Sequence, residues 1–174
     1  QVHTLPDGQS GVWTLTTDSP DRARPACAET PRLADGVMLN KPSVRSNGEW
    51  LFPVSFCTSK PLKNEKRMLP AFLRTYILAL MSDEEIQKVD ERAGAWVYIS
   101  DDKGATFTPR GRAVAPYEYS THNEHMVAEL SDGRLWMLLR TSYGIGSSVS
   151  GDGGASWSAV TESGIPHTSS RFFF

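Results

Sequence analysis

The chain has 174 residues, of which 39% are hydrophobic, so it is long enough to bury a globular core. Its 18 basic and 20 acidic side chains give a net charge of −2, which argues against a nucleic-acid-binding surface rich in lysine and arginine. Its longest apolar runs are shorter than the roughly 18 residues of a membrane span, and its 14 glycines and 11 prolines suit a turn-rich β protein.

The first predicted element is a strand at residues 11–17, which are rich in β-branched and aromatic side chains. Residues 18–35 contain several prolines and aspartates and are interpreted as a loop. Cys27 in this loop and Cys57 show no metal-ligand spacing. A disulfide and two buried free thiols therefore both remain open.

A hairpin is predicted next, with strands at residues 42–46 and 49–56 joined by an Asn-Gly turn at 47–48. Asn-Gly is the preferred sequence of a two-residue type I′ turn. In such a turn Ser46 faces Glu49, and this pairing sets the register of both strands.

Residues 58–93 interrupt the strand pattern and are interpreted as an insertion within one β unit. Residues 60–66 form a polar loop, and the apolar residues 69–81 suit either a helix or a strand. A capping box at residues 82–85 predicts a helix that ends near Glu91.

Six further strands are predicted, at residues 94–100, 107–112, 126–130, 135–141, 145–150 and 156–160. The Asp-Gly at 132–133 predicts a second tight hairpin, in which the residues flanking the dipeptide face each other. This register places His125 opposite Arg140. Glu124 and Arg140 then lie on opposite faces of the hairpin, unless the strand ends splay or bulge.

Two segments repeat the same pattern fifty residues apart. Residues 100–107 read S-x-D-x-G-x-T-F, and residues 150–157 read S-x-D-x-G-x-S-W. Each follows an apolar stretch with strand character and leads into another. A hairpin motif repeated at this period indicates a radial or stacked β-array.

Three positions of the repeat have a physical role in its turn. The aspartate accepts hydrogen bonds from backbone N–H groups one to three residues further on, the glycine adopts a positive φ, and the aromatic residue packs beneath the turn. These positions are Asp102, Gly104 and Phe107 in the first repeat and Asp152, Gly154 and Trp157 in the second. The other carboxylates of a calcium-binding loop are missing, so turn locking is preferred to calcium binding.

The repeats resemble the Asp-box, or bacterial neuraminidase repeat, of sialidase-like β-propellers. The resemblance implies an all-β fold with about three four-stranded antiparallel blades of a six-bladed sialidase-like propeller. In that family the boxes lie on the outer rim, away from the substrate, so they indicate the fold rather than the reaction.

The blades are expected to form a single incomplete propeller domain. Residues 1–35 would belong to a preceding blade, 36–115 form a blade with the insertion at 58–93, 116–162 form a second blade and 163–174 begin the next. Because the chain starts at Gln1 and ends on an apolar run, we expect a piece of a longer protein. Its partners would be the remaining blades of the same propeller, and its sheet edges at both ends would be unpaired.

Propeller sites lie at one mouth of the central channel, where the innermost strands begin. The predicted starts, at residues 40–42, 123–125 and 170–172, all carry polar or charged side chains before an apolar strand. Residues 122–140 resemble the exo-sialidase stretch N-E-x-x-V-V-E-L-x-D-G-x-L-x-x-x-x-R. The resemblance implies that Glu124 partners a nucleophilic tyrosine and that Arg140 belongs to an arginine triad that binds the substrate carboxylate.

The remaining candidates surround these two residues in the sequence. His125 is a candidate catalytic acid or base near neutral pH. The candidate substrate-binding residues, besides Arg140, are Asn40, Lys41, His122, Tyr143 and Arg171. Glu129 and Arg45 are interpreted as structural, and the spacing of His122 and His125 is poor for a metal ion. No metal or cofactor is therefore predicted.

The resemblance implies an exo-glycosidase of sialidase type that acts on terminal acidic sugars of glycans. The histidines favour an alternative, a polysaccharide lyase or rhamnosidase-like enzyme, and a non-catalytic glycan-binding propeller is a third reading. The first triad arginine, the acid/base aspartate and the nucleophilic tyrosine of the family are not found, so the isolated piece is expected to be inactive. The resemblance favours a secreted or periplasmic location.

Overall fold

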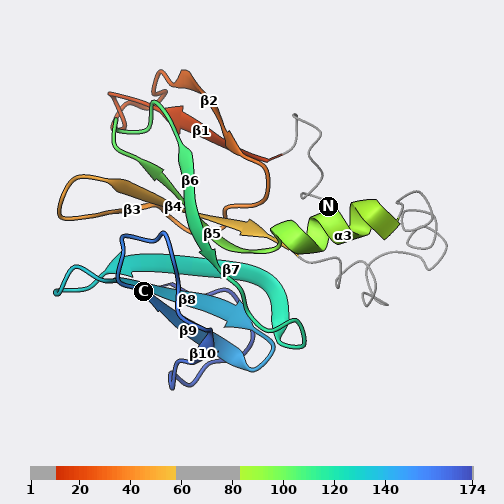
Figure 1. The fold of residues 1–174 in the computed structure, drawn as a ribbon. Helices are drawn as coiled ribbons and strands as arrows, with labels where there is room; N and C mark the ends of the chain where they lie inside the picture. Colours follow the sequence, from red (N-terminus) through yellow and green to blue (C-terminus); the bar gives the residue numbers. More distant parts are fainter. Residues whose placement is uncertain (1–10, 58–82, 174) are drawn as a thin grey trace.

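A computed structural model describes residues 11–57 and 83–173 of the chain (Figure 1). The predictions for residues 60–66 and 69–81 fall outside these described ranges. Within them, the one helix is α3 (Asp83–Arg92), which lies where the capping box predicts it, and the other regular elements are β-strands. The described residues contain no helix that is long and apolar enough to cross a membrane.

Three antiparallel sheets follow one another along the chain. The first pairs β1 (Val12–Thr16) with β2 (Ala28–Ala34). The second has the order β3 (Ser43–Val44), β4 (Trp50–Phe56), β5 (Gly94–Ser100) and β6 (Thr108–Ala113). The third has the order β7 (Ser120–Glu129), β8 (Leu135–Thr141), β9 (Gly144–Ser150) and β10 (Thr161–Glu162).

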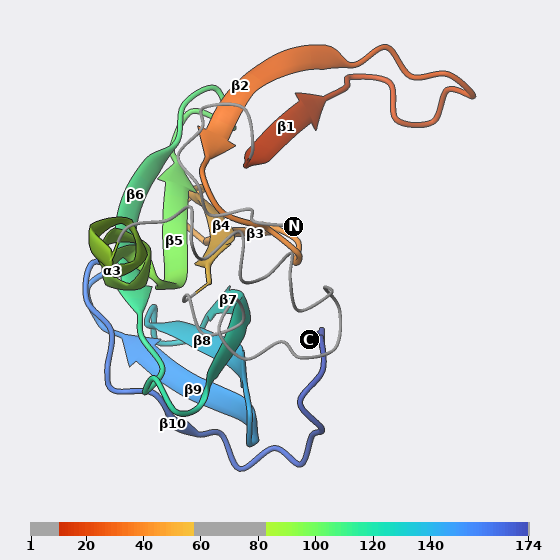
Figure 2. The same ribbon diagram turned by 90° about the vertical axis from the view of Figure 1, so that its right-hand side faces the viewer.

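The sheets are arranged as part of a propeller. Figure 2 shows them along an arc, with β3 and β7 toward its inner side and β6 toward the outside. In each four-stranded sheet the strands therefore follow the sequence from the inside outward, which is the order of a propeller blade. The chain is all-β, with four-stranded antiparallel blades of a partial propeller.

The hydrophobic core lies between neighbouring sheets. Leu51 and Val97 of the second sheet pack with Met137 and Leu139 of the third, and all four are fully buried. The opposite face of β4 is buried as well, because Phe52, Val54 and Phe56 pack with residues of the first sheet. Burial on both faces explains why β4 is almost continuously apolar instead of alternating.

Three strand predictions are wrong in position. The first is the strand at 126–130, because β7 begins at Ser120, six residues before it. The loop predicted at residues 18–35 contains β2, whose sequence has little strand propensity and which becomes a strand by pairing with β1. The last strand of the third sheet is β10 at residues 161–162, not 156–160. Ser158 is bound to Val149 through its backbone N–H and its hydroxyl, and the ladder with β9 resumes only at Thr161.

The predicted registers of both hairpins are wrong by one residue. In the first hairpin Val44 pairs with Trp50, and in the second Glu129 pairs with Leu135. Each turn has a three-residue loop that ends in a glycine with positive φ, which is 87° at Gly48 and 81° at Gly133. A three-residue hairpin loop of this kind consists of a type I turn and a glycine that forms a β-bulge. The prediction assumed a two-residue turn, and this is why its register is wrong by one residue.

Candidate functional site

The third sheet has two distinct ends. At one end β7 begins, β8 finishes and β9 begins, with Thr141 opposite Ser120 on one side and Gly144 on the other. We call this the mouth end. At the other end Leu135 pairs with Ser150, the first residue of the second Asp-box, and we call it the box end.

The second sheet is aligned with the third. The Asn40 side chain donates a hydrogen bond to the carbonyl of His125 (2.8 Å), and the Ser43 hydroxyl donates one to the carbonyl of Val127 (2.7 Å). The chain around β3 therefore runs beside β7 in the same direction. The innermost strands of both blades begin at the mouth end, and both Asp-boxes lie at the opposite end.

The first box is a network of hydrogen bonds around Asp102. Its carboxylate accepts the backbone N–H groups of Ala105 (3.0 Å) and Thr106 (2.9 Å), and the hydroxyl of Ser100 (2.7 Å). The donors lie three and four residues on, slightly further than expected. Hydrogen bonds from the side chain and then the backbone of Thr106 lower the pKa of Asp102 to about 2. Gly104 has a φ of 90°.

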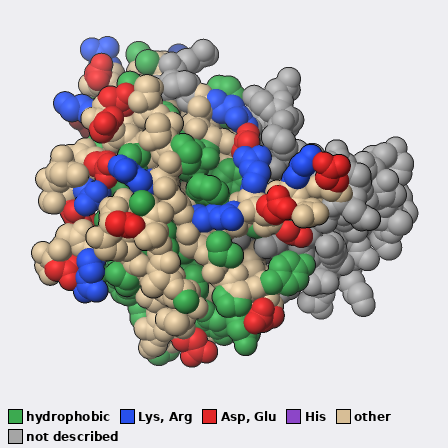
Figure 3. Space-filling model, viewed as in Figure 1, with side chains coloured by type: hydrophobic (Ala, Val, Ile, Leu, Met, Phe, Trp, Pro, Cys, Tyr) green, Lys and Arg blue, Asp and Glu red, His purple; other side chains and the backbone are tan. Residues whose placement is uncertain are grey.

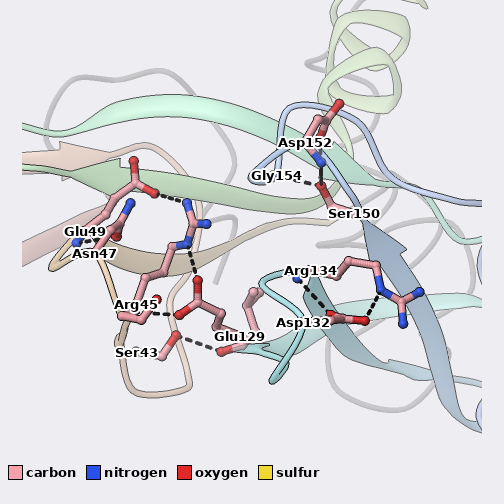
Figure 4. A network of polar contacts seen from close by, with 12 residues as sticks. Ser43, Arg45, Asn47, Glu49, Glu129, Asp132, Arg134, Ser150, Asp152 and Gly154 are labelled. Carbon is pink, nitrogen blue, oxygen red and sulfur yellow. Dashed lines mark hydrogen bonds and ion pairs between the residues drawn. The ribbon is translucent and has the colours of Figure 1, made fainter.

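The second box repeats this geometry. Asp152 accepts the backbone N–H of Ser156 (2.9 Å) and the hydroxyl of Ser150 (2.8 Å), and its pKa is lowered by the side-chain and backbone hydrogen bonds of Ser156. Ser150 also accepts the backbone N–H of Gly154 (2.8 Å), whose φ is 93°. Figure 4 shows Ser150 between Asp152 and Gly154. The close match with the first box agrees with the repeat read from the sequence.

The closing aromatic residues lie against their turns and sheets. Phe107 packs edge-on against Phe52 with ring centroids 5.0 Å apart, and it belongs to the core between the first two sheets. Trp157 donates its indole N–H to the carbonyl of Gly154 (3.0 Å) and packs against the core between the blades.

An ionic network joins the two blades at the box end (Figure 4). Arg45 contacts Glu49 (2.7 Å) within its own hairpin and Glu129 (3.2 Å) at the end of β7. Glu129 also accepts the backbone N–H of Ser46, and Arg110 contacts Glu49 (3.0 Å). The hydrogen bond from Ser46 lowers the pKa of Glu129. Arg45 and Glu129 therefore brace the blades, far from the mouth end.

The mouth end contains an ion pair between Glu124 and Arg140. Nη1 of Arg140 donates to Oε2 of Glu124 (3.3 Å), and Nη2 donates to the carbonyl of Ser169 (3.0 Å). Glu124 is only 8% exposed, whereas the Arg140 side chain is 22% exposed. The pair therefore joins β7, β8 and the segment that follows β10.

A bulge in β7 shapes this end of the strand. Between the pairs Ser120–Thr141 and His125–Leu139, β7 contains residues 121–124, whereas β8 contains only Arg140. The first part of β7 therefore leaves the regular ladder of hydrogen bonds. The hydroxyl of Thr121 donates to the carbonyl of Arg140 (3.2 Å) within this bulge.

His125 is buried between the blades and is only 1% exposed. Its Nε2 lies 2.9 Å from the carbonyl of Trp96, and its Nδ1 lies 3.3 Å from the hydroxyl of Ser55. A carbonyl only accepts, so Nε2 carries the proton and Nδ1 accepts from Ser55. The ring thus connects β7 to β4 and β5 while the neighbouring Glu124 points to Arg140.

Three buried polar atoms at the mouth end have no hydrogen-bond partner in the described part of the chain. They are Oδ1 of Asn40, Nε of Arg140 and Nδ1 of His167, whose backbone carbonyl lies close to Gly144 at the start of β9. Asn40 is 5% exposed, and its Nδ2 already binds the carbonyl of His125.

The other candidates lie on the segments that adjoin these residues. Lys41 is exposed beside Asn40. Arg171 is exposed, with its guanidinium 4.7 Å from the centre of the Phe173 ring. Tyr143 is half-buried in the turn after β8, where burial raises its pKa. His122 lies in β7, but its side chain is outside the described part of the structure.

Cys57 is a mouth-end residue whose sequence context suggested only a disulfide or a buried free thiol. Cys27 and Cys57 form no disulfide, and Cys27 is exposed. Burial raises the pKa of the Cys57 thiol to about 11, and the negative charge of Glu124 contributes to the shift. One sequence feature could have identified Cys57 as a mouth-end residue. It directly follows β4, at the end where the inner strands begin.

The fold and the repeated turns define an Asp-box propeller, and comparison of the sequence with known families agrees. The BNR repeat-like domain family matches residues 8–172, so the chain belongs to this family and to the sialidase/BNR-repeat superfamily.

Among solved structures, the chain is similar to a protein of unknown function from Dyadobacter fermentans DSM 18053, known from a crystal structure. The two are 21% identical, with a TM-score of 0.48. The match covers 71% of this chain and 27% of that chain, so this chain spans about a quarter of that protein's length. No curated protein matches the chain.

Proposed function

We propose that this chain supplies part of the active site of a sialidase-like exo-glycosidase, which removes terminal acidic sugars from glycans. The observation that carries the proposal is the Glu124–Arg140 pair. It lies where an innermost strand begins, at the end of the blade opposite to the Asp-boxes. The family match supports the propeller class, and the chemistry of these side chains supports the reaction.

Arg140 would bind the carboxylate of the acidic sugar. A guanidinium has five N–H donors in a rigid plane. One N–H of Nη1 and one of Nη2 hold the group against Glu124 and Ser169, and each of these nitrogens has a second N–H. A planar group fixed in this way is suited to binding a carboxylate through two parallel hydrogen bonds.

Glu124 would take the proton of a tyrosine hydroxyl that attacks the anomeric carbon. Its Oε2 is engaged by Arg140, which leaves Oε1 as the acceptor. A carboxylate beside a tyrosine activates the hydroxyl as a nucleophile. The tyrosine itself and the remaining arginines and acid would come from blades outside this chain, so the chain alone would be inactive.

The neighbouring candidates would support this pair. His125 has both ring nitrogens engaged, so it suits positioning of Glu124 better than contact with substrate. Asn40 would fix the same strand through the His125 carbonyl. Lys41 and Arg171 are exposed cations that would attract an acidic sugar, and Tyr143 would line the rim.

The test is turnover of fluorogenic sialosides and uronosides by the full-length protein and its Glu124→Gln variant. We expect hydrolysis of one class by the wild type and a loss of at least about 100-fold in kcat for the variant. Glu129→Gln is a matched control, because it makes the same change in the same strand at the box end, and it should lower stability rather than kcat. Unchanged turnover in Glu124→Gln would remove the assigned role.

A non-catalytic glycan-binding propeller is the second candidate function. The observation that favours it is that Arg140 already donates hydrogen bonds to two acceptors of the protein itself. An arginine bound in this way is also suited to a purely structural role. In that case the full-length protein would bind an acidic oligosaccharide without cleaving it, and Glu124→Gln would change affinity only.

A further inference from the structure

The segment that follows β10 lies against one face of the third sheet. This face carries Leu138 of β8 and Ile145 of β9, and both pack with the buried ring of Phe172. The backbone N–H of Ser163 donates to the carbonyl of Ile145 (3.0 Å), so the segment is attached near both of its ends. We call residues 163–172 the strap. Figure 2 shows it passing along the third sheet from β10 toward the inner side of the arc.

Arg140 projects onto the face that the strap covers. It pairs with Ile145 across β8 and β9, and residues paired in this way share a face of the sheet. The strap meets Arg140 there, because the carbonyl of Ser169 accepts a hydrogen bond from Nη2 (3.0 Å). Nε of the same guanidinium is buried and has no hydrogen-bond partner in the described part of the chain.

His167 of the strap is held by packing and by its backbone. Its ring packs edge-on against Phe172, with ring centroids 5.6 Å apart and an interplanar angle of 71°. Its carbonyl lies against Gly144, where an added Cβ would come within 2.8 Å of it. Nδ1 of the ring is buried and, among the described residues, it too has no hydrogen-bond partner.

Two buried polar atoms without partners under one strap are costly. Each costs about 1–3 kcal/mol, and most buried polar atoms of folded proteins are hydrogen-bonded. His125 shows the usual arrangement, because one of its ring nitrogens contacts a carbonyl and the other a hydroxyl. A ligand that offers acceptors to both His167 and Arg140 would remove this cost.

A carboxylate is the group that fits the two atoms. Nε of Arg140 always donates, and a neutral imidazole can carry its proton on Nδ1. The two oxygens of one carboxylate can accept from both, and hydrogen bonds to a charged acceptor are stronger than neutral ones. Arg171, exposed on the strap, adds a positive charge that offsets the negative charge of Glu124.

The surroundings and the strap suit such a ligand. Figure 3 shows hydrophobic side chains gathered near the β6–β7 connection, at the lower right of the view and at this end of the third sheet. Hydrogen bonds are stronger in apolar surroundings than in water. Residues 164–171 belong to no strand, and Thr168 and Ser170 are exposed, so a shift of the strap can admit a ligand.

We propose that Nδ1 of His167 and Nε of Arg140 together bind the carboxylate of the acidic sugar, so that His167 is a substrate-binding residue. This inference rests on the proposed function, because that function places an acidic sugar at Arg140. It adds a histidine donor to the site and gives the strap a part in recognising the charge of the ligand.

The first experiment measures the affinity of the full-length protein for methyl glucuronide and methyl sialoside by calorimetry. Each is compared with an analogue that lacks the charged carboxylate, methyl glucoside or the methyl ester of the sialoside. Wild type should prefer one of the acidic ligands. His167→Phe keeps a ring beside Phe172 and removes Nδ1, so it should weaken binding of that ligand by about tenfold or more and leave its analogue unchanged.

Two conservative variants identify the nitrogen that binds. The side-chain amide of asparagine can take the place of Nδ1, and that of glutamine can take the place of Nε2. His167→Asn should therefore keep most of the affinity, whereas His167→Gln should bind as weakly as His167→Phe. Equal affinities of wild type and His167→Phe, or rescue by His167→Gln alone, would overturn the proposal.

Stability separates ligand binding from a structural role. Without ligand, His167→Phe should have a urea midpoint no lower than that of wild type, because it removes a buried polar atom that has no partner. His125→Phe is the matched control, since both nitrogens of His125 have partners in the protein, and it should lower the midpoint. A similar loss in both variants would show that Nδ1 of His167 has a structural partner, and it would overturn the proposal.

Acetate separates this inference from the proposed function. If neither acidic sugar binds to wild type, the sugar assignment fails, and nitrogen-15 NMR of the histidine-labelled protein then reports whether a carboxylate binds. A shift of the Nδ1 signal of His167 with acetate, and not with the same concentration of chloride, would support the carboxylate site. No shift would overturn it, and so would equal affinities of wild type for the acidic ligands and their uncharged analogues.

Discussion

Arg140 donates a hydrogen bond to Glu124 across 3.3 Å, from the strand that pairs with the one carrying Glu124. Glu124 and Arg140 are the residues next to the observed pair His125–Leu139 on the side of the mouth end. Their contact therefore depends on the three-residue turn at the other end of the hairpin, which sets the register up to this pair, and on the bulge in β7 that begins beyond it.

Breaking this pair should destabilise the protein. Arg140→Gln leaves the Glu124 carboxylate buried beside a neutral group, so we expect the free energy of unfolding to fall by about 2 kcal/mol. Adding Glu124→Gln to that variant removes the uncompensated charge and should restore part of the loss. Urea denaturation of the two single variants and the double variant measures both effects. Additive losses in the double variant would show that the two side chains do not interact.

The sequence predicted the sheets well where the pattern is local. The strands at 94–100 and 135–141 match β5 and β8, because apolar residues with strand propensity fill them and turn residues bound them. The hydrogen bonds of both Asp-boxes join residues two to four positions apart, so they also follow from the sequence.

The site was less predictable, because it depends on contacts between distant residues. A glycine at the third loop position of the turn, Gly133, shifts the register by one residue and moves Glu124 to the face of Arg140. The contacts of His125 with Ser55 and Trp96 arise from packing between blades, which no local pattern encodes. β2 was missed for the same reason, since its partner determines its structure.

Removing the positive-φ glycine of a box should strain its turn. Gly154 has a φ of 93°, and a Cβ there would meet the Leu135 side chain at 3.4 Å. Gly154→Ala should lower the free energy of unfolding by about 1–3 kcal/mol. Gly151→Ala is the matched control in the same turn, because a Cβ there meets nothing within 4 Å. Thermal denaturation compares the two variants, and equal losses would contradict the role given to the backbone conformation.

The carboxylate of Asp102 should make stability depend on pH. Its pKa is lowered from 3.8 to about 2 in the folded state, first by the side-chain and backbone hydrogen bonds of Thr106. A lowered folded-state pKa stabilises the protein above the unfolded value, and this stabilisation is lost as the pH falls from about 4 toward 2. Asp102→Asn should show a smaller loss over this interval, measured by urea midpoints. Asp101→Asn, at the exposed neighbouring position, should behave as wild type.

Replacement of His125 should weaken the junction between the blades. His125→Ala leaves the Trp96 carbonyl without its donor and creates a cavity at a site that is 1% exposed. We expect a loss of about 2–4 kcal/mol in the free energy of unfolding. His125→Gln, which keeps a donor and an acceptor, should lose less. Hydrogen exchange should show that the amides of β5 and β7 lose protection in His125→Ala. A loss of protection confined to the first sheet would contradict the role of His125 between the blades.

The reactivity of Cys57 should report the charge of Glu124. Burial raises the pKa of this thiol to about 11, with a smaller contribution from the Glu124 carboxylate. Because the thiolate is the reactive form, iodoacetamide at pH 8 should alkylate Cys57 far more slowly than the exposed Cys27, which serves as an internal control. Glu124→Gln removes the negative charge and should speed the reaction of Cys57 alone, whereas Glu129→Gln at the box end should not. Mass spectrometry of the two peptides over time measures both rates. Equal acceleration by the two variants would indicate general loosening of the blade instead of an electrostatic effect at the mouth end.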